Sequence, residues 1–225
     1  MTTQISSLEF THFPVMLSEI IEISNPKKGG IFIDCTFGGG NYTKALLDFP
    51  KTKVIGIDRD GAVISIARKM EKNFKNRFKF YHLKFSQLEK VCKDNVDVIL
   101  IDLGLSSIQL QDFKRGFSFK SKEKLDMTMG LSDNSAQHAI NNLSENQLTL
   151  IIKVLGEEKD AKKISRNIVK ARLQKKITRV DELVKIINKS KKKNYYSKIN
   201  PSTKTFQALR IYVNKEITEL INGII

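Results

Sequence analysis

Along the first hundred residues, short apolar runs rich in β-branched and aromatic side chains alternate with stretches of helical periodicity. The apolar runs are "GIFIDC" (30–35), "KVIGID" (53–58), "FKFYHL" (78–83) and "VDVILID" (96–102). Between them lie "NYTKALLDF" and "AVISIARKMEKN", and the second of these places four apolar residues on one helical side: Val63, Ile64, Ile66 and Ala67. Strands that alternate with helices predict a parallel sheet with right-handed crossovers. The nearly continuous apolar run over 96–102 also predicts a strand buried on both faces.

From about residue 110 the alternation stops. The segment 111–130 is polar and dotted with aromatic residues. We expect a long loop there, and in compact domains such loops are more often functional than incidental. The next segment, "SENQLTLIIKVLG", predicts a helix that opens with a capping box of Ser144 and Gln147 and ends at Gly156.

The stretches that follow also predict helices. "EEKDAKKISRNIVKARL" carries apolar residues at helical spacing: Ala161, Ile164, Ile168 and Ala171. "TRVDELVKIINKS" repeats the capping signal, with Thr178 and Asp181. After a polar stretch, one final amphipathic helix is expected, with an apolar stripe of Phe206, Leu209, Val213, Ile217 and Leu220.

Together these elements predict an α/β fold with three parts. Residues 1–109 form the first part of a Rossmann-like sheet domain. Residues 110–195 form an inserted, basic, all-helical domain. Residues 196–225 form a linker and a helix that returns to pack on the sheet.

The charge of the chain points to its partner. There are 39 lysine and arginine residues against 24 aspartate and glutamate residues, a formal net charge of +15. The excess is concentrated between Lys162 and Lys198, where 14 residues are basic and two are acidic. A basic block favours a polyanion, because each phosphate that it neutralises releases condensed counterions. The alternative is a solvated lysine-rich face, since lysine is easily kept at a surface.

The composition argues against several other classes of protein. No run approaches the roughly 20 apolar residues that a membrane span needs. The start, "MTTQISSLEF", lacks the basic and apolar regions of a signal peptide. Cys35 and Cys92 are too few and too far apart for a disulfide framework or a metal site. We therefore expect a cytoplasmic protein without a bound metal.

Three consecutive glycines follow the first predicted strand, in "DCTFGGGNYTKALL" (34–47). A dinucleotide fingerprint needs a further glycine where Thr43 stands, and a P-loop needs a Gly-Lys-Ser/Thr ending. Neither pattern is complete. What remains is a turn whose backbone, at Gly38 and Gly40, comes close to a nucleoside.

Two acidic residues suggest which nucleoside this is. Asp58 follows Gly38 by twenty residues and ends the second predicted strand, where a carboxylate can accept hydrogen bonds from both ribose hydroxyls. Asp34 adds a negative charge that would repel a phosphate and attract a cation. S-adenosylmethionine contains a ribose and a sulfonium cation but no phosphate, so we expect this methyl donor. Taken singly, Asp58 could be a strand-end cap, Gly39 a loop residue and Asp34 a helix N-cap.

The segment "IDLGLSSIQLQD" (101–112) ends the fourth predicted strand. In methyltransferases that act on amines, this position holds a loop led by an acid or an asparagine. An exocyclic amine is a poor nucleophile because its lone pair is delocalised, and acceptors on its N–H groups hold it in line with the donor. Asp102 is the best candidate for this acceptor, with Ser106 and Ser107 as helpers. The alternative is that these residues cap a helix.

Several motifs together resemble one known family. They are "HFPVML", "DCTFGGGNY", "GIDRD", "DLGLSSIQLQD", "RGFSF", "LDMTM", "GEE" and "PSTKTFQALRIYVNKEI". In this order they resemble the bacterial small-subunit ribosomal RNA (cytosine-N4)-methyltransferases of the MraW type. The resemblance implies methylation of the N4 amine of a cytidine in the decoding region of 16S ribosomal RNA, with S-adenosylmethionine as the donor. It implies cofactor contacts at Gly40, Asn41, Tyr42, Asp58, Phe85, Asp102 and Gln109.

The resemblance also suggests where the RNA binds. Residues of "RGFSF" and "LDM" are expected to line the target-base side, because an extruded base needs an aromatic wall and polar contacts. They are Arg115, Phe117, Phe119, Asp126 and Met127. The alternative is that they only order the long loop. The helices over 157–174 and 179–190, with Lys191 and Lys192, are expected to grip the RNA backbone.

In the family the chain continues past the last helix into further strands, whereas this sequence ends at Ile225. The expectation is therefore a sheet without its C-terminal strands. A rival interpretation is a catalytically weak or inactive member that acts as an RNA-binding protein. A methyltransferase for another RNA or DNA amine is a second rival, although "RGFSF" and "LDMTM" argue against it.

Overall fold

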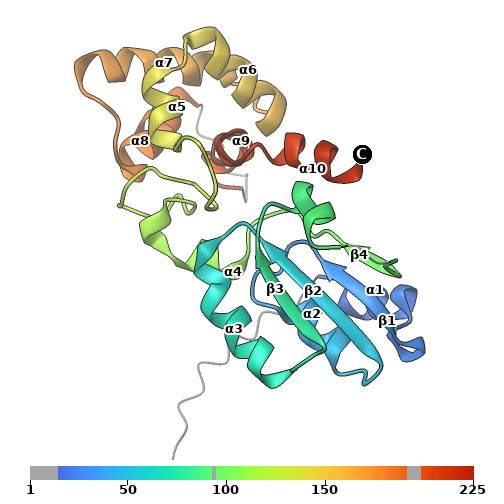
Figure 1. The fold of residues 1–225 in the computed structure, drawn as a ribbon. Helices are drawn as coiled ribbons and strands as arrows, with labels where there is room; N and C mark the ends of the chain where they lie inside the picture. The colour runs from blue at the N-terminus through green and yellow to red at the C-terminus, as the bar shows by residue number, and fades with distance from the viewer. Residues whose placement is uncertain (1–14, 93–94, 192–198) are drawn as a thin grey trace, which may run out of the picture.

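A computed structural model describes residues 15–92, 95–191 and 199–225 of the chain (Figure 1). Its sheet has four parallel strands in the order β3-β2-β1-β4. The strands are β1 (Gly30–Asp34), β2 (Thr52–Asp58), β3 (Phe78–His82) and β4 (Val98–Leu100). The predicted parallel sheet is confirmed.

Helices α1 (Leu17–Ser24), α2 (Asn41–Leu47) and α3 (Ile64–Asn73) belong to the same part of the molecule as the sheet. The core between α2, α3 and the sheet follows from strand register. Phe32 pairs with Val54, and Val54 pairs with Phe78, so their side chains share one face of the sheet. Together with Leu46 and Ala67 from the helices they form a buried apolar cluster.

Strand β4 corrects one prediction. We expected the apolar run 96–102 to be buried on both faces, but Ile99 is 45% exposed and none of the three strand residues is fully buried. Among the described residues β4 pairs with β1 alone and lies at an edge of the sheet. A continuous apolar pattern indicates that both faces of a strand need apolar neighbours. It does not say which elements cover those faces.

A second part, which we call the helical layer, consists of α5 to α9. They are α5 (Ala136–Asn142), α6 (Glu145–Gly156), α7 (Ala161–Gln174), α8 (Val180–Ser190) and α9 (Thr203–Asn214). Their apolar stripes meet in one buried cluster that includes Leu148, Ile152, Ile164, Ile168, Leu183, Ile187, Phe206 and Leu209. Figure 1 shows this layer, in yellow to red, beside the sheet. In the described part of the chain, no helix has the length and apolar character to cross a bilayer.

The capping box predicted for α6 is confirmed, because Ser144 and Gln147 exchange hydrogen bonds with each other's backbone N–H. Gly156 is the last residue of α6, which ends because Glu157 adopts a left-handed conformation. Helix packing explains why this last residue is a glycine. A Cβ atom at this position would come within 2.4 Å of the backbone oxygen of Lys204 on α9. A residue without a side chain lets α6 and α9 approach closely.

The cap predicted for α8 was assigned to the wrong acid. Glu182 accepts hydrogen bonds from the backbone N–H groups of Thr178 and Arg179, at 2.9 and 3.1 Å. Asp181 instead pairs with Arg179 and Lys185. The N-cap is Arg179, which places Glu182 at the third helical position, from which a glutamate reaches back to the cap.

The single final helix that we predicted is two helices. Lys215 adopts a left-handed conformation with φ of 50° and separates α9 from α10 (Glu216–Ile224). Phe206, Leu209 and Val213 of α9 are buried in the helical layer. Helix α10 returns to the sheet part, where it contacts η3 (Phe85–Lys90). Ile217, which we placed in the stripe, is 49% exposed. The predicted boundary at residue 195 lies outside the described residues and stays a prediction.

Candidate active site

A cavity of about 390 Å³ opens at the carboxyl ends of β1, β2 and β4. Its walls contain most of the residues predicted as cofactor contacts and all three predicted to assist the amine. They are Gly38, Asn41, Tyr42, Asp58, Phe85, Asp102, Ser106, Ser107 and Gln109. This edge of a parallel sheet is where ligands of open α/β folds bind.

The glycine turn is held by Asp58. The Gly38 N–H donates to Asp58 Oδ2 at 2.7 Å, and the Asp60 N–H donates to Asp58 Oδ1 at 2.8 Å. Gly40 is buried behind the turn with φ of 75°, and a Cβ atom there would lie 2.7 Å from the Phe37 ring. Gly40 therefore shapes the turn but does not line the cavity.

Asp34 also lies behind the turn and outside the cavity wall. Its carboxylate accepts hydrogen bonds from Thr43 Oγ1 at 2.7 Å and from the Thr36 N–H at 3.2 Å, and it is 1% exposed. Burial raises the pKa of Asp34 to about 6, with smaller contributions from the nearby negative charges of Asp58 and Asp102. It is not the N-cap of α2 either, since Gly40 holds that position.

Asp102 stands exposed at the mouth of the cavity. Its N–H donates to Thr36 Oγ1 at 2.9 Å, which ties the end of β4 to the end of β1. Tyr42 Oη lies 2.6 Å from the Val15 backbone oxygen and 3.3 Å from Asp102 Oδ2. Burial, with the neighbouring negative charge of Asp102, raises the pKa of Tyr42 to about 12. The Asp102 carboxylate thus accepts a long hydrogen bond from Tyr42 and is otherwise exposed at the mouth, where a ligand can reach it.

Ser106 has the helix-capping role that was the alternative to a catalytic one. It is the N-cap of α4 (Ser107–Gln111) and forms a capping box with Gln109. Gln109 is buried, and its Nε2 donates to Asp60 Oδ2 at 2.7 Å. Ser107 lines the cavity from the first position of α4.

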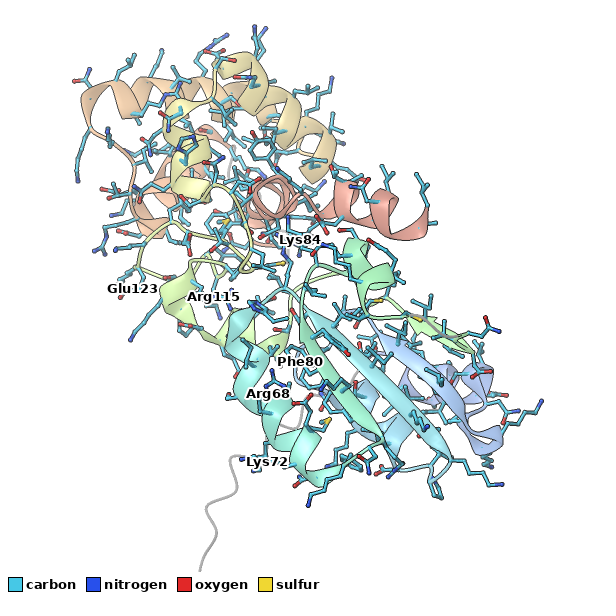
Figure 2. All side chains as sticks on the ribbon, viewed as in Figure 1. Arg68, Lys72, Phe80, Lys84, Arg115 and Glu123 are labelled. Atoms are coloured by element: carbon cyan, nitrogen blue, oxygen red, sulfur yellow. The ribbon has the colours of Figure 1, made fainter. Side chains whose placement is uncertain are left out.

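The five residues expected on the target-base side do not line the cavity. Arg115 donates to Asp60 Oδ2 and to the Thr128 backbone oxygen, at 2.6 and 2.7 Å. Figure 2 shows it where the chain passes from the sheet part to the helical layer. Phe117 and Met127 are buried in the helical layer, Phe119 packs edge-on against Phe206, and Asp126 accepts from the Thr128 hydroxyl. Their observed contacts are those of residues that order the loop.

Of the two lysines predicted to contact the RNA backbone, the structure describes Lys191 but not Lys192. Lys191 Nζ donates to Glu158 Oε2 at 2.6 Å and to the Pro201 backbone oxygen at 2.9 Å. Lys192 lies outside the described residues. Other lysines of α7, α8 and the segment between them are exposed: Lys162, Lys163, Lys170, Lys176 and Lys189.

Sequence reasoning missed several residues of the cavity wall, among them Arg59, Met129, Glu216 and Glu219. Arg59 adjoins Asp58, so its proximity could have been noticed. The two glutamates come from α10, more than 150 residues after β2, and no local pattern places them there. Glu219 is buried and accepts a hydrogen bond from Ser86 Oγ at 2.7 Å, beside Phe85. Lys84, labelled in Figure 2, approaches the same carboxylate at 3.5 Å.

The wall of this cavity suits a cationic nucleoside without phosphate. Among the described residues its acidic members are Asp58, Asp102, Glu216 and Glu219, whereas Arg59 is its basic member. The Arg59 guanidinium already donates to backbone oxygens of Gly130, Leu131 and Asn214. Arg210 pairs with Glu216, and Lys84 approaches Glu219. Asp58 and Asp102 are therefore the wall carboxylates that would repel a phosphate and stabilise a sulfonium cation. The chemistry of these donors and acceptors therefore fits S-adenosylmethionine.

Comparisons with known proteins give a consistent result. The profile of the MraW methylase family matches residues 9–224. The ribosomal RNA small subunit methyltransferase H of Ehrlichia canis is 41% identical over 218 residues, which cover 95% of this chain and 73% of that protein. The protein of the same name from Orientia tsutsugamushi (strain Ikeda) is 42% identical over 216 residues, covering 94% and 69%.

Proposed function

Since this chain belongs to the MraW methylase family, we propose that it methylates the N4 amine of a cytidine in the decoding region of 16S ribosomal RNA. The chain is a methyltransferase, and its methyl donor is S-adenosylmethionine. The choice of RNA rests on the relatives, which are named ribosomal RNA small subunit methyltransferases. The choice of an amine rests on Asp102 at the end of β4, and this is the observation that carries the proposal.

The cofactor would be held by three kinds of contact. Asp58 would accept hydrogen bonds from the ribose hydroxyls, in exchange for part of its present contact with the glycine turn. Phe85 would cover the adenine, and the acidic wall would favour the positive charge at sulfur. When bound, S-adenosylmethionine supplies a methyl group that is open to attack by a nucleophile.

Asp102 would act on the amine. The lone pair of the cytosine N4 amine is delocalised into the ring, so the free amine attacks poorly. A carboxylate that accepts a hydrogen bond from one N–H draws the nitrogen toward a tetrahedral shape and fixes its orientation. Asp102 has its backbone anchored to Thr36 and its carboxylate at the cavity mouth, as this role requires.

The exposed lysines of the helical layer would bind the RNA backbone. Each phosphate contact by a lysine releases counterions, so RNA affinity is expected to fall steeply as salt rises. The extruded cytidine would enter at the mouth formed by Leu103, Gly104 and Leu105. Base extrusion is the general route by which such enzymes reach a base atom.

Two measurements test the proposal. Calorimetric titration with S-adenosylmethionine should show saturable binding that Asp58→Ala removes. The chain should then transfer labelled methyl to small ribosomal subunits, and nucleoside analysis should find it on N4 of cytidine. Asp102→Ala should abolish transfer and leave RNA affinity within about twofold, whereas Asp133→Ala, at an exposed position on the loop before α5, should retain transfer.

Methyl found on another base, or full transfer by Asp102→Ala, would contradict the proposal. A folded chain that binds RNA but neither binds the cofactor nor transfers methyl would instead support the non-catalytic alternative.

A further inference from the structure

We propose that Asp60 is a positioning residue that sets the geometry of the loop from Asp102 to Ser107. Asp60 itself does not line the cavity, and it acts through Gln109 and Arg115. The kinetic part of this inference rests on the proposed function, whereas its structural part does not.

Asp60 is the meeting point of three segments. Its side chain is nearly inaccessible, at 3% exposed. Oδ2 accepts from Gln109 Nε2 at 2.7 Å and from Arg115 Nη1 at 2.6 Å, and Oδ1 accepts from the Ala62 N–H at 3.0 Å. Burial would raise the pKa of Asp60, but the hydrogen bonds from Arg115 and Gln109 outweigh burial and lower it. Asp60 therefore holds a charged carboxylate in a dry site at neutral pH.

Gln109 connects Asp60 to the active-site loop, by which we mean the loop from Asp102 to Ser107. While its Nε2 donates to Asp60, its Oε1 accepts from the Ser106 N–H at 3.0 Å. The amide group is thus fixed at both ends, and it locates Ser106, the N-cap of α4, relative to the end of β2. Removal of Asp60 would leave the Gln109 amide without its buried acceptor.

The loop needs such a restraint. One end is anchored where the Asp102 N–H donates to Thr36, and the other end is anchored at Ser106. Between them Gly104 has φ of 152°, and a Cβ atom there would meet nothing within 4 Å. Packing does not constrain this glycine. The two anchors therefore set the course of the loop together with Leu105, which packs against the helical layer, and with the Tyr42 hydroxyl, which reaches the Asp102 carboxylate.

Arg115 completes the arrangement from the other side. Its second guanidinium nitrogen donates to the Thr128 oxygen, and its guanidinium lies 5.3 Å from the centre of the Phe117 ring. Asp60 thereby joins the loop from Asp102 to Ser107 to the segment that precedes the helical layer. Arg115, predicted from the sequence as a base contact, is by this inference the counter-ion of a positioning carboxylate.

The test compares Asp60→Asn with Glu71→Gln. An asparagine side chain in place of Asp60 has one acceptor oxygen and one NH₂ donor. If the oxygen faces Gln109 and Arg115, the Ala62 N–H loses its acceptor. If the oxygen faces the Ala62 N–H, the NH₂ group faces the Gln109 and Arg115 donors. Glu71 is a control with the same kinds of partner, because this partly buried carboxylate also accepts from an arginine, Arg68, and from a backbone N–H, that of Phe80. Glu71 does not line the cavity.

Hydrogen–deuterium exchange of the whole chain is measured first, without cofactor or RNA. We expect exchange over residues 102–112 to accelerate about tenfold or more in Asp60→Asn, with β1 and β2 protected as in wild type. Glu71→Gln should leave 102–112 unchanged. Equal protection of 102–112 in wild type and Asp60→Asn would overturn the proposal whether or not the chain methylates RNA.

Kinetics provide the second readout. Asp60→Asn should lower kcat at least about tenfold and change the KM for S-adenosylmethionine less than about threefold, because Asp58 and Phe85 remain in place. The double variant Asp60→Asn with Gln109→Glu restores a donor–acceptor pair and the net charge, and it should recover part of kcat. A fall in kcat that Glu71→Gln reproduces would show general destabilisation and contradict a positioning role.

Discussion

The buried carboxylate of Asp34 predicts a specific dependence of stability on pH. Asp34 lies beneath the glycine turn, where it accepts two hydrogen bonds and, among the described residues, has no cationic partner. The perturbation is Asp34→Asn, which has nearly the same shape. Its Oδ1 can still accept from the Thr36 N–H, and the Thr43 hydroxyl can rotate to accept from Nδ2.

The size of the change in unfolding free energy follows from the pKa of Asp34. Burial raises the pKa of Asp34 from its ordinary value of 3.8 to about 6. Such a rise corresponds to about 3 kcal/mol, at about 1.4 kcal/mol per pKa unit. The folded state then binds the proton more tightly than the unfolded state. The stabilising contribution is therefore complete below about pH 4 and is lost as the pH rises through about 6.

Urea unfolding followed by circular dichroism, at intervals from about pH 3.5 to about pH 7.5, measures this effect. The difference in unfolding free energy between Asp34→Asn and wild type should move in favour of the variant by up to about 3 kcal/mol as pH rises from about 4 to about 6.5. Asp48→Asn, an exposed position just after α2, controls for the loss of one negative charge. A difference for Asp34→Asn that stays constant across this range would refute the reasoning.

Three further substitutions test other contacts, each by urea unfolding. Asn214→Ala removes four hydrogen bonds from a fully buried amide and should cost about 3 kcal/mol or more, since backbone partners are left unpaired. Gly130→Ala should cost about 1–3 kcal/mol, because φ is 71° and the added Cβ would lie 2.5 Å from a backbone oxygen. Lys191→Ala leaves buried Glu158 unpaired and should cost about 2 kcal/mol. Because the Lys191 ammonium pairs with Glu158, we expect, in contrast to the role predicted from the sequence, that this variant leaves the salt dependence of RNA binding unchanged, unlike Lys162→Ala.

The parts of the fold that could be predicted from sequence depend on neighbours along the chain. Apolar runs and helical periodicity located β1, β2 and β3 to within one or two residues. The capping box at Ser144 was also identifiable, because its partner stands three residues away. The spacing between the glycine turn and Asp58 is set by one strand–helix–strand unit, so that contact could be anticipated too.

What could not be predicted depends on residues far apart in sequence. The Arg59 guanidinium donates to the backbone of Asn214, which is 155 residues away, and no periodicity encodes such a contact. The break at Lys215 falls within an apolar stripe that would suit one continuous helix, so the stripe alone misled us. Asp60 carries no local signal, yet it joins Gln109 and Arg115.

The break at Lys215 bears on the order in which the parts of the protein fold during synthesis. The apolar cluster between α2, α3 and the sheet draws on residues 21–108, and the helical layer's cluster draws on residues 105–213, so each can form soon after its own segment leaves the ribosome. The cavity wall from α10 follows later, because Glu216 and Glu219 lie beyond both clusters. A nascent chain would therefore hold its glycine turn and Asp58 in place well before α10 completes the cavity wall. High-affinity cofactor binding during synthesis should begin only when α10 docks against Phe85.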